Sequence, residues 1–197
     1  MQIDALREIC SISSGNAATA ISKIINKAIN MGIPSVRLLP VSEVPEAMGG
    51  GNLMIVGVYN RILGDMQGGF LLTFPIESAY ALADILLKKG MGQTKEIDEM
   101  DKSALEEAGN QITWAFINAL SKMTNLEFSL SVPRMAVDMA GAIIDFILIE
   151  LVEVAEYAMV LEILFNDVPE TITGKFFIIP DPNLLNVLLD VADAKFK

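Results

Sequence analysis

Apolar residues recur at helical spacing in two long stretches of the chain, one in each half. In the second half, the segment Asp98–Asn125 places an apolar residue every three or four positions, which predicts an amphipathic helix. Near the N-terminus, the segment Asp4–Asn30 is also predicted to be helical. The apolar side of the second helix is predicted to carry Leu105, Ala108, Ile112, Phe116, Ala119 and Met123.

Shorter apolar runs between these helices predict β-strands. In the first half, strands are predicted at 35–41, 53–60 and 67–74. In the second half, they are predicted at 128–139, 157–165 and 175–179. Further helices are predicted at 77–89, 140–151 and 183–196, and the segment 88–98, with its two glycines and mixed charge, is predicted to be a linker.

The two halves repeat each other when the chain is shifted by 99 residues. Glu8 then aligns with Glu107 and Pro34 with Pro133, and small apolar residues around both glutamates also match. This duplication predicts an α+β fold, a pseudo-twofold unit with a shared, mainly antiparallel sheet and two long helices packed on one face. We expect one domain over residues 1–197, made of two repeats at about 1–92 and 98–197.

Polar residues form a stripe on the second long helix, opposite its apolar side. At about 100° per residue, Ser103, Glu107 and Asn110 fall within a sector of about 60°, so they are predicted to face solvent or a partner. Gly109 lies at the flank of the apolar side, where we expect it to allow close packing at a helix-propensity cost of about 1 kcal/mol. A solvated surface without function is the alternative interpretation of a single such stripe.

Composition removes several classes of function. The chain contains no histidine and one cysteine, which excludes histidine-based nucleophile systems, histidine-ligated metal sites and an internal disulfide. A net charge of −11 argues against a nucleic-acid surface. Charged residues interrupt the most apolar region, 135–165, before it reaches the roughly 18 residues of a spanning helix, and no signal peptide is recognised. A cytoplasmic protein is expected.

Other polar residues have ordinary structural interpretations. Asp98, Glu99 and Asp101 could suggest a metal site, but acidic residues are typical of the first turn of a helix. Trp114 lies near the edge of the apolar side and is predicted to be a core residue rather than a docking residue. We therefore predict no metal site in the protein itself.

The spacing of the polar stripe resembles the signature of a known family. The pattern begins with a hydroxyl or acidic residue, followed by Glu four positions later, Asn three positions after the Glu and Pro 23 positions after the Asn. It is similar to the active-site pattern of the CheC/CheX/FliY chemotaxis phosphatases. The second half reads Ser103, Glu107, Asn110, Pro133, and the run "SSGNAATAIS" also resembles CheC proteins. CheC is the closest match over nearly the whole chain, because the added switch module of FliY-type chains is not visible.

The resemblance implies a specific activity in two-component chemotaxis signalling. Such proteins hydrolyse the phosphoryl-aspartate of the response regulator CheY. The Asn is thought to hold the attacking water and the Glu to engage a lysine of the regulator, which brings its own Mg²⁺. By this comparison Glu107 and Asn110 are the catalytic residues, and the protein needs no cofactor of its own. The receptor deamidase CheD is a further possible partner, so the alternative function is a weakly catalytic or non-catalytic module that regulates CheD.

The first half departs from the pattern. It reads Asp4, Glu8, Ser11, Pro34, with serine where the asparagine belongs. Because loss of one transition-state hydrogen-bond partner typically costs about 10²–10³ in rate, we expect this second site to be impaired or silent. Asn16 is not a substitute, since it is rotated by about 80° from Glu8 and displaced by about 12 Å along the axis.

Overall fold

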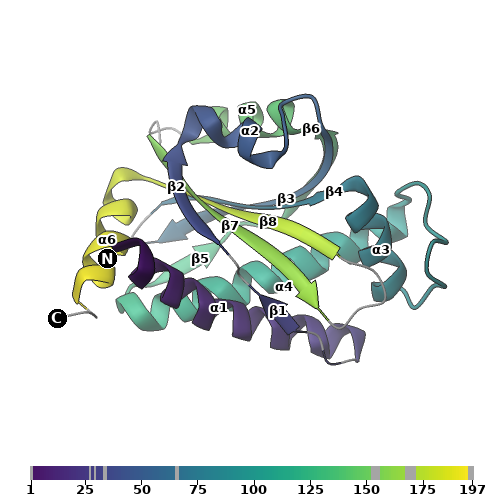
Figure 1. The fold of residues 1–197 in the computed structure, drawn as a ribbon, viewed down its shortest axis with the longest axis horizontal. Coiled ribbons are helices and arrows are strands. Elements are labelled where there is room, and N and C mark those ends of the chain that lie inside the picture. The colour runs from purple at the N-terminus through teal and green to yellow at the C-terminus, as the bar shows by residue number, and fades with distance from the viewer. Residues whose placement is uncertain are drawn as a thin grey trace.

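The computed structural model describes one sheet with helices on both faces (Figure 1). The described residues are 2–26, 28, 30–32, 35–64, 67–151, 156–166 and 172–194. The helices are α1 (Gln2–Ile25), α2 (Val44–Met48, preceded by the 3₁₀ turn η1, Val41–Glu43), α3 (Ile76–Leu86), α4 (Glu99–Thr124), α5 (Ala140–Glu150) and α6 (Pro182–Ala194). The strands are β1 (Asn30–Gly32), β2 (Val36–Pro40), β3 (Met54–Gly64), β4 (Gly68–Pro75), β5 (Phe128–Leu130), β6 (Arg134–Met139), β7 (Tyr157–Asn166) and β8 (Ile172–Pro180).

The eight described strands pair antiparallel throughout. Their order is β1-β7-β8-β4-β3-β5, with β2 also beside β7 and β6 also beside β3. The two central strands, β4 and β8, come from different halves of the chain, and Leu71 lies opposite Phe177. The α+β class and the shared antiparallel sheet predicted from the sequence are confirmed.

Each half also contributes strands to the other half's hairpin. Strand β2 pairs with β7, and β6 pairs with β3, so the outer strands cross between the halves. A half folded alone would lose these partners and expose the edges of its hairpin. This exchange supports our proposal that residues 1–197 form one domain built from two repeats.

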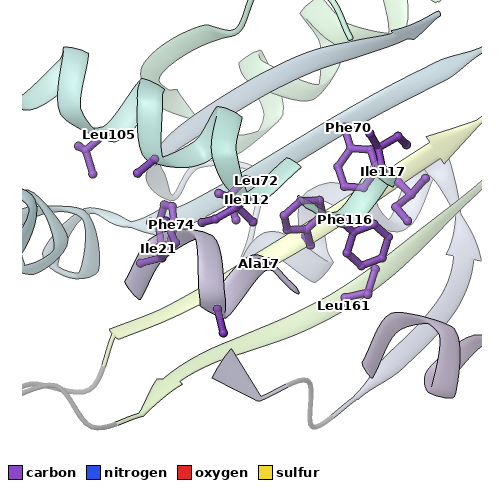
Figure 2. Close-up of a cluster of buried hydrophobic side chains, with 14 of the residues drawn as sticks. Ala17, Ile21, Phe70, Leu72, Phe74, Leu105, Ile112, Phe116, Ile117 and Leu161 are labelled. Atoms are coloured by element: carbon purple, nitrogen blue, oxygen red, sulfur yellow. The ribbon is translucent and has the colours of Figure 1, made fainter. Parts of the chain in front are cut away.

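The sheet is buried on both faces. Helices α1, α3, α4 and α6 cover one face and α2 and α5 the other, with α1 and α4 side by side (Figure 1). Figure 2 shows the core beneath the two long helices, where Ala17 and Ile112 meet the sheet residues Leu72 and Phe74. The ring of Phe116 lies 5.3 Å from that of Phe70, a contact that anchors α4 to the centre of the sheet.

The ends of α4 follow the local chemistry of its sequence. Asp98 is the N-cap: its side chain accepts hydrogen bonds from the backbone N–H groups of Met100 and Asp101, both at 2.8 Å. The side chain of Asp101 in turn accepts a hydrogen bond from the backbone N–H of Asp98, which completes a capping box. Asn125 closes the helix with a left-handed φ of 58°. The structural interpretation of these acidic residues is therefore confirmed.

Two boundaries differ from those predicted. Helix α1 ends at Ile25 rather than at Asn30, because Asn26 adopts a left-handed φ of 53° that stops the helix. The single strand predicted at 128–139 is two strands, β5 and β6. Between the pairs Tyr59–Arg134 and Ile62–Leu130, two residues of β3 lie opposite three residues of this segment, a bulge that displaces Ser131–Pro133 from the ladder. Helix α2 was not predicted from the sequence.

The segment predicted to be a linker is firmly held. The carboxylate of Asp84 on α3 is 1% exposed and accepts hydrogen bonds from the N–H of Thr94 at 2.9 Å and from its hydroxyl at 2.7 Å. Lys89 forms an ion pair of 2.5 Å with Asp101 on α4. Burial alone would raise the pKa of Asp84, but the hydrogen bonds from Thr94 and Gln93 lower it below its usual value. The connection between the repeats is thus a structured joint.

Candidate active site

The predicted polar stripe lies on the outer side of α4. Ser103 and Glu107 are exposed, and Asn110 is half-buried. The opposite side of the helix is inside the core, where Leu105 and Ala108 are each 1% exposed. The placement predicted for these residues is confirmed: the carboxamide that the sequence singles out is accessible at the edge of the helix.

Gly109 brings α4 into direct contact with the sheet. A Cβ atom added at this position would lie 2.8 Å from Cγ1 of Val58 on β3, closer than side-chain atoms pack. The prediction that this glycine serves close packing is confirmed. Because the next residue is Asn110, the same approach brings its side chain to the helix-facing side of β3.

Asn60 is the partner of Asn110 on the sheet. Its side chain is fully buried, and its Nδ2 donates a hydrogen bond of 3.3 Å to Oδ1 of Asn110. The same nitrogen donates to the backbone oxygen of Ser131 at 3.1 Å. Sequence reasoning missed Asn60. The available signal was a lone amide on the helix-facing side of a strand whose other residues on that side, such as Val56 and Ile62, are apolar.

The loop that carries Pro133 adjoins this pair of asparagines. Ser131 donates its N–H to the oxygen of Arg61 at 2.9 Å and accepts the N–H of Arg61 on its Oγ at 2.9 Å. These bonds fix the loop to the end of β3, one residue beyond Asn60. Val132 is 83% exposed at the tip of the loop. The proline of the signature therefore belongs to a bulge beside the asparagine pair.

Glu107 lies one turn before Asn110 on the same helix. Its Oε1 accepts a hydrogen bond of 2.8 Å from Nε2 of Gln111, four residues later. This contact orients the carboxylate on the exposed surface. A carboxylate held in this way can receive a cation from a partner protein.

The described residues of α1 and β7 do not show the same arrangement of amides. Ser11 on α1 is exposed, where Asn110 stands in the second half. On β7, the helix-facing residues Met159 and Leu161 are apolar members of the core, and the next alternate residue in the sequence is Ile163. Asn16 is exposed on α1.

Three residues predicted for the first site fall partly or wholly outside the structural description. Asp4 and Glu8 belong to α1, but their side chains lie outside the described residues, and Pro34 lies outside them altogether.

The opposite face of the sheet contains a separate cavity of about 470 Å³ between α5 and strands β3 and β6. Tyr59, Arg134 and Phe146 line it. Burial raises the pKa of Tyr59 to about 12, so its phenol stays protonated at physiological pH. Since Tyr59 and Asn60 are consecutive strand residues, their side chains point to opposite faces, and this cavity is not part of the candidate site.

The described part of the chain offers neither a membrane-spanning helix nor a cluster of metal ligands. None of its helices is long and apolar enough to cross a membrane. Within the same residues, no three His, Cys, Asp or Glu side chains are grouped in a way that could hold a metal ion. The candidate site thus offers an oriented amide and an exposed carboxylate, which suit positioning of a nucleophile supplied from outside.

Comparison with protein families gives a match to both copies of the signature. A model of the CheC-like family matches residues 1–37 and 100–136, the segments that contain α1 and α4 and the loops after them. The protein named CheY-P phosphatase CheC from Bacillus subtilis (strain 168) is 30% identical over 184 residues, which cover 91% of this chain and 88% of that protein. The flagellar motor switch phosphatase FliY of the same organism is 30% identical over 135 residues, 68% of this chain and 35% of that protein.

Solved structures share the fold at lower identity. The crystal structure of Thermotoga maritima FliY matches with a TM-score of 0.79 and 21% identity, covering 98% of this chain and 96% of that chain. The CheX-CheY-BeF₃-Mg²⁺ complex from Borrelia burgdorferi contains a chain that matches with a TM-score of 0.52 and 17% identity, over 84% of this chain and 93% of that chain. The sequence identity to CheC extends over most of both chains, and on that ground this protein belongs to the CheC-like family.

Proposed function

We propose that this protein hydrolyses the phosphoryl-aspartate of a CheY-type response regulator in chemotaxis signalling, at one site formed by Glu107 and Asn110. The observation that carries the proposal is the half-exposed carboxamide of Asn110, held on the outer side of α4 beside an exposed carboxylate. The name of its Bacillus subtilis relative, CheY-P phosphatase CheC, supports the same substrate. A cytoplasmic location is part of this proposal.

Asn110 orients the attacking water. The carbonyl oxygen of an amide has two lone pairs, and Asn60 uses one of them. Two N–H donors and one lone pair remain to hold a water molecule in line with the phosphorus without any change of protonation. The water oxygen forms a bond to phosphorus, the bond from phosphorus to the aspartyl oxygen breaks, and its electron pair stays on the carboxylate. The water protons pass to the released phosphate and to solvent.

Glu107 binds the regulator rather than the phosphoryl group. A carboxylate near the phosphoryl oxygens would repel them, whereas a lysine of the regulator would pair with it. In this scheme Mg²⁺ stays on the regulator, as the composition of the CheX-CheY-BeF₃-Mg²⁺ complex suggests for that relative. The protein then needs no cofactor of its own, because phosphoryl transfer depends mainly on positioning and charge neutralisation.

The substrate is expected to be a folded phosphoprotein. A chain with a net charge of −11 does not attract free phosphate esters. The signature residues also include no arginine or lysine that could neutralise the charge of such an ester. We therefore expect no appreciable turnover of small phosphate esters, with p-nitrophenyl phosphate as the test substrate.

The test is phosphate release from a phosphorylated regulator with the wild type, Asn110→Ala and Glu107→Ala. Asn110→Ala should lower the rate by about 10²–10³, the usual effect of removing one transition-state partner. Glu107→Ala should act mainly through weaker binding of the regulator. Equal rates for all three proteins would refute the assignment of the site.

The alternative, a binding module for the deamidase CheD, predicts a different result. In that case the wild type would bind its partner without measurable phosphate release, and binding would survive Asn110→Ala. The same set of variants, assayed for both binding and turnover, distinguishes the two functions.

A further inference from the structure

We infer that Asn60 is a positioning residue that fixes which end of the Asn110 carboxamide faces the attacking water. The inference rests on the proposed role of Asn110 and goes further, because Asn60 lies in β3, outside the family signature. Its side chain is fully buried beneath α4 and reaches the site only through Asn110 and the backbone of Ser131.

The orientation of both amides follows from the backbone oxygen of Ser131. A carbonyl oxygen only accepts hydrogen bonds, so the Asn60 atom 3.1 Å from it is the donor Nδ2. The same Nδ2 lies 3.3 Å from the side chain of Asn110, whose nearest atom is therefore the acceptor Oδ1. The Nδ2 end of Asn110 consequently points away from Asn60. The backbone oxygen of Ser131 thus determines the direction of a catalytic amide two contacts away.

Without Asn60 this direction would not be fixed. The terminal torsion of asparagine has two broad, nearly equivalent states that exchange the oxygen and the nitrogen. A half-exposed Asn110 would then populate both orientations, and only one presents its donors and its remaining lone pair correctly. Pre-organisation of this kind lowers the barrier because no reorientation is needed when the regulator docks.

Asn60 is an unfavourable choice for stability alone. Among the described residues, its Oδ1 is one of the buried polar atoms with no hydrogen-bond partner. Buried polar groups in folded proteins are nearly always paired, so an unpaired one calls for a specific reason. The Nδ2 contacts to Asn110 and Ser131 supply that reason, because they require an amide at this position.

The two halves of the chain provide an internal comparison. Where α1 carries Ser11 instead of asparagine, the helix-facing residues Met159 and Leu161 of β7 are apolar. The helix with the signature asparagine, α4 of the second half, therefore packs on a strand of the first half that carries the buried amide, whereas the described helix-facing residues of β7 are apolar. This agreement is expected if Asn60 serves Asn110 and has no general role in the sheet.

The hydrogen bond to Ser131 also connects Asn60 to the neighbouring loop. It joins the catalytic helix to the bulge that carries Val132 and Pro133. Movement of this loop when a regulator docks would be transmitted to Asn110 through a single side chain. Asn60 therefore links the helix that carries the signature asparagine to the loop that carries the signature proline.

The test uses Asn60→Leu, which places at this position an apolar residue like Leu161 of β7, and Asn60→Ser, whose shorter side chain does not reach Asn110. Thr73→Val is the matched control. Thr73 is also buried, at 3% exposed, and its hydroxyl donates a hydrogen bond to the backbone oxygen of Lys175 on β8, away from the Asn60–Asn110 pair. Both Asn60 variants should lower kcat for phosphoryl-regulator hydrolysis by about 10–100-fold and leave KM within about twofold. Thr73→Val should leave both constants unchanged.

Two further measurements separate positioning from a structural role. In the Asn110→Ala background, Asn60→Leu should cause no further loss of kcat, whereas a structural defect would add its own loss. Independently of activity, NMR order parameters of the Asn110 side-chain NH₂ should fall in Asn60→Leu relative to the wild type and Thr73→Val. An equally ordered amide in Asn60→Leu would overturn the inference. If Asn110→Ala kept the wild-type rate, the proposed function of the site would fail, while the NMR result would still decide whether Asn60 orients Asn110.

Discussion

Helices α1 and α4 pack side by side on one face of the same sheet, yet they present different side chains at corresponding positions. On α4, Asn110 is held by the buried amide of Asn60 and lies beside an ordered bulge. On α1, the exposed Ser11 stands at the aligned position, and the described helix-facing residues Met159 and Leu161 of β7 are apolar. The core beneath the two helices is nevertheless continuous, with Ala17 and Phe116 in one cluster.

This difference separates what the fold needs from what the site needs. The exchange of β2 and β6 between the halves and the shared aromatic core depend on both repeats. The amide pair joins one residue from each half, Asn60 of β3 and Asn110 of α4, and contributes little to packing. The fold is therefore complete although only one of its two long helices carries the signature asparagine.

Adding a side chain at Gly109, where α4 touches the sheet, should produce the largest change in stability. Gly109→Cys places the first-half residue where a Cβ would meet Val58 at 2.8 Å, so we expect a loss of about 2–3 kcal/mol in the free energy of unfolding and a lower kcat. Gly15→Cys on α1 is the control, because a Cβ atom added there meets no atom within 4 Å, and it should neither destabilise the protein nor change kcat. Urea unfolding together with the phosphatase assay measures both effects, and equal costs for the two variants would contradict the closer approach of α4.

The shorter helices offer a second comparison. Asp84 on α3 is buried and hydrogen-bonded to Thr94, whereas Asp190 on α6 is exposed. Asp84→Asn should destabilise the protein by about 2 kcal/mol at neutral pH, and Asp190→Asn should have little effect.

The effect of Asp84 should depend on pH in a defined direction. The folded state lowers the pKa of Asp84, so its contribution is present above the unfolded value and is lost as pH falls through the folded value. Unfolding curves of the wild type and Asp84→Asn should therefore converge at acidic pH. A difference that grows on acidification would show that the carboxylate is not stabilised as the structure indicates.

Two equally exposed apolar residues on opposite faces test where the regulator docks. Val132, 83% exposed, lies in the bulge beside Asn110, and Ile149, 82% exposed, lies on α5 across the sheet. Val132→Asp should raise KM for the phosphorylated regulator about tenfold, which corresponds to about 1.4 kcal/mol, with kcat nearly unchanged. Ile149→Asp is the control and should change neither constant. A larger effect from Ile149→Asp would place the regulator on the other face.

Restoring the missing asparagine should have the smallest effect. Ser11→Asn places in the first half the asparagine that its copy of the signature lacks, and this variant should gain some phosphatase activity. Because Leu161 provides no donor to orient the new amide, we expect the gain to stay below about twofold in total rate. The assay in the Asn110→Ala background removes the activity of the second site and makes a small gain visible. A gain that restores the full rate would show that no orienting partner is required.

The sequence predicted those features of the site that depend on neighbouring residues in the chain. The helical period placed Ser103 and Glu107 on the surface, and Asp98 identified the start of α4. Asn60 was missed because it meets Asn110 across 50 residues, a contact that helical or strand periodicity does not encode. The crossing of β2 and β6 between the halves is of the same kind, since strand pairing depends on the whole sheet.

Local chemistry also explains the boundaries that were wrong. Asn26 ends α1 through its left-handed backbone, although asparagine is also common inside longer helical patterns. The run 128–139 alternates well enough to suggest one strand, and the bulge at Ser131 becomes evident only from its pairing with Arg61 on β3. In both cases the deciding interaction lies outside the periodic pattern.

The most direct test compares one substitution in each half in the same assay. The initial rate of phosphate release from a saturating phosphorylated CheY-type regulator is measured for the wild type, Asn110→Ala and Ser11→Ala. We predict a fall of about 10²–10³ for Asn110→Ala and an unchanged rate for Ser11→Ala. A comparable loss in both variants, or no loss in Asn110→Ala, would contradict a single active site oriented by Asn60.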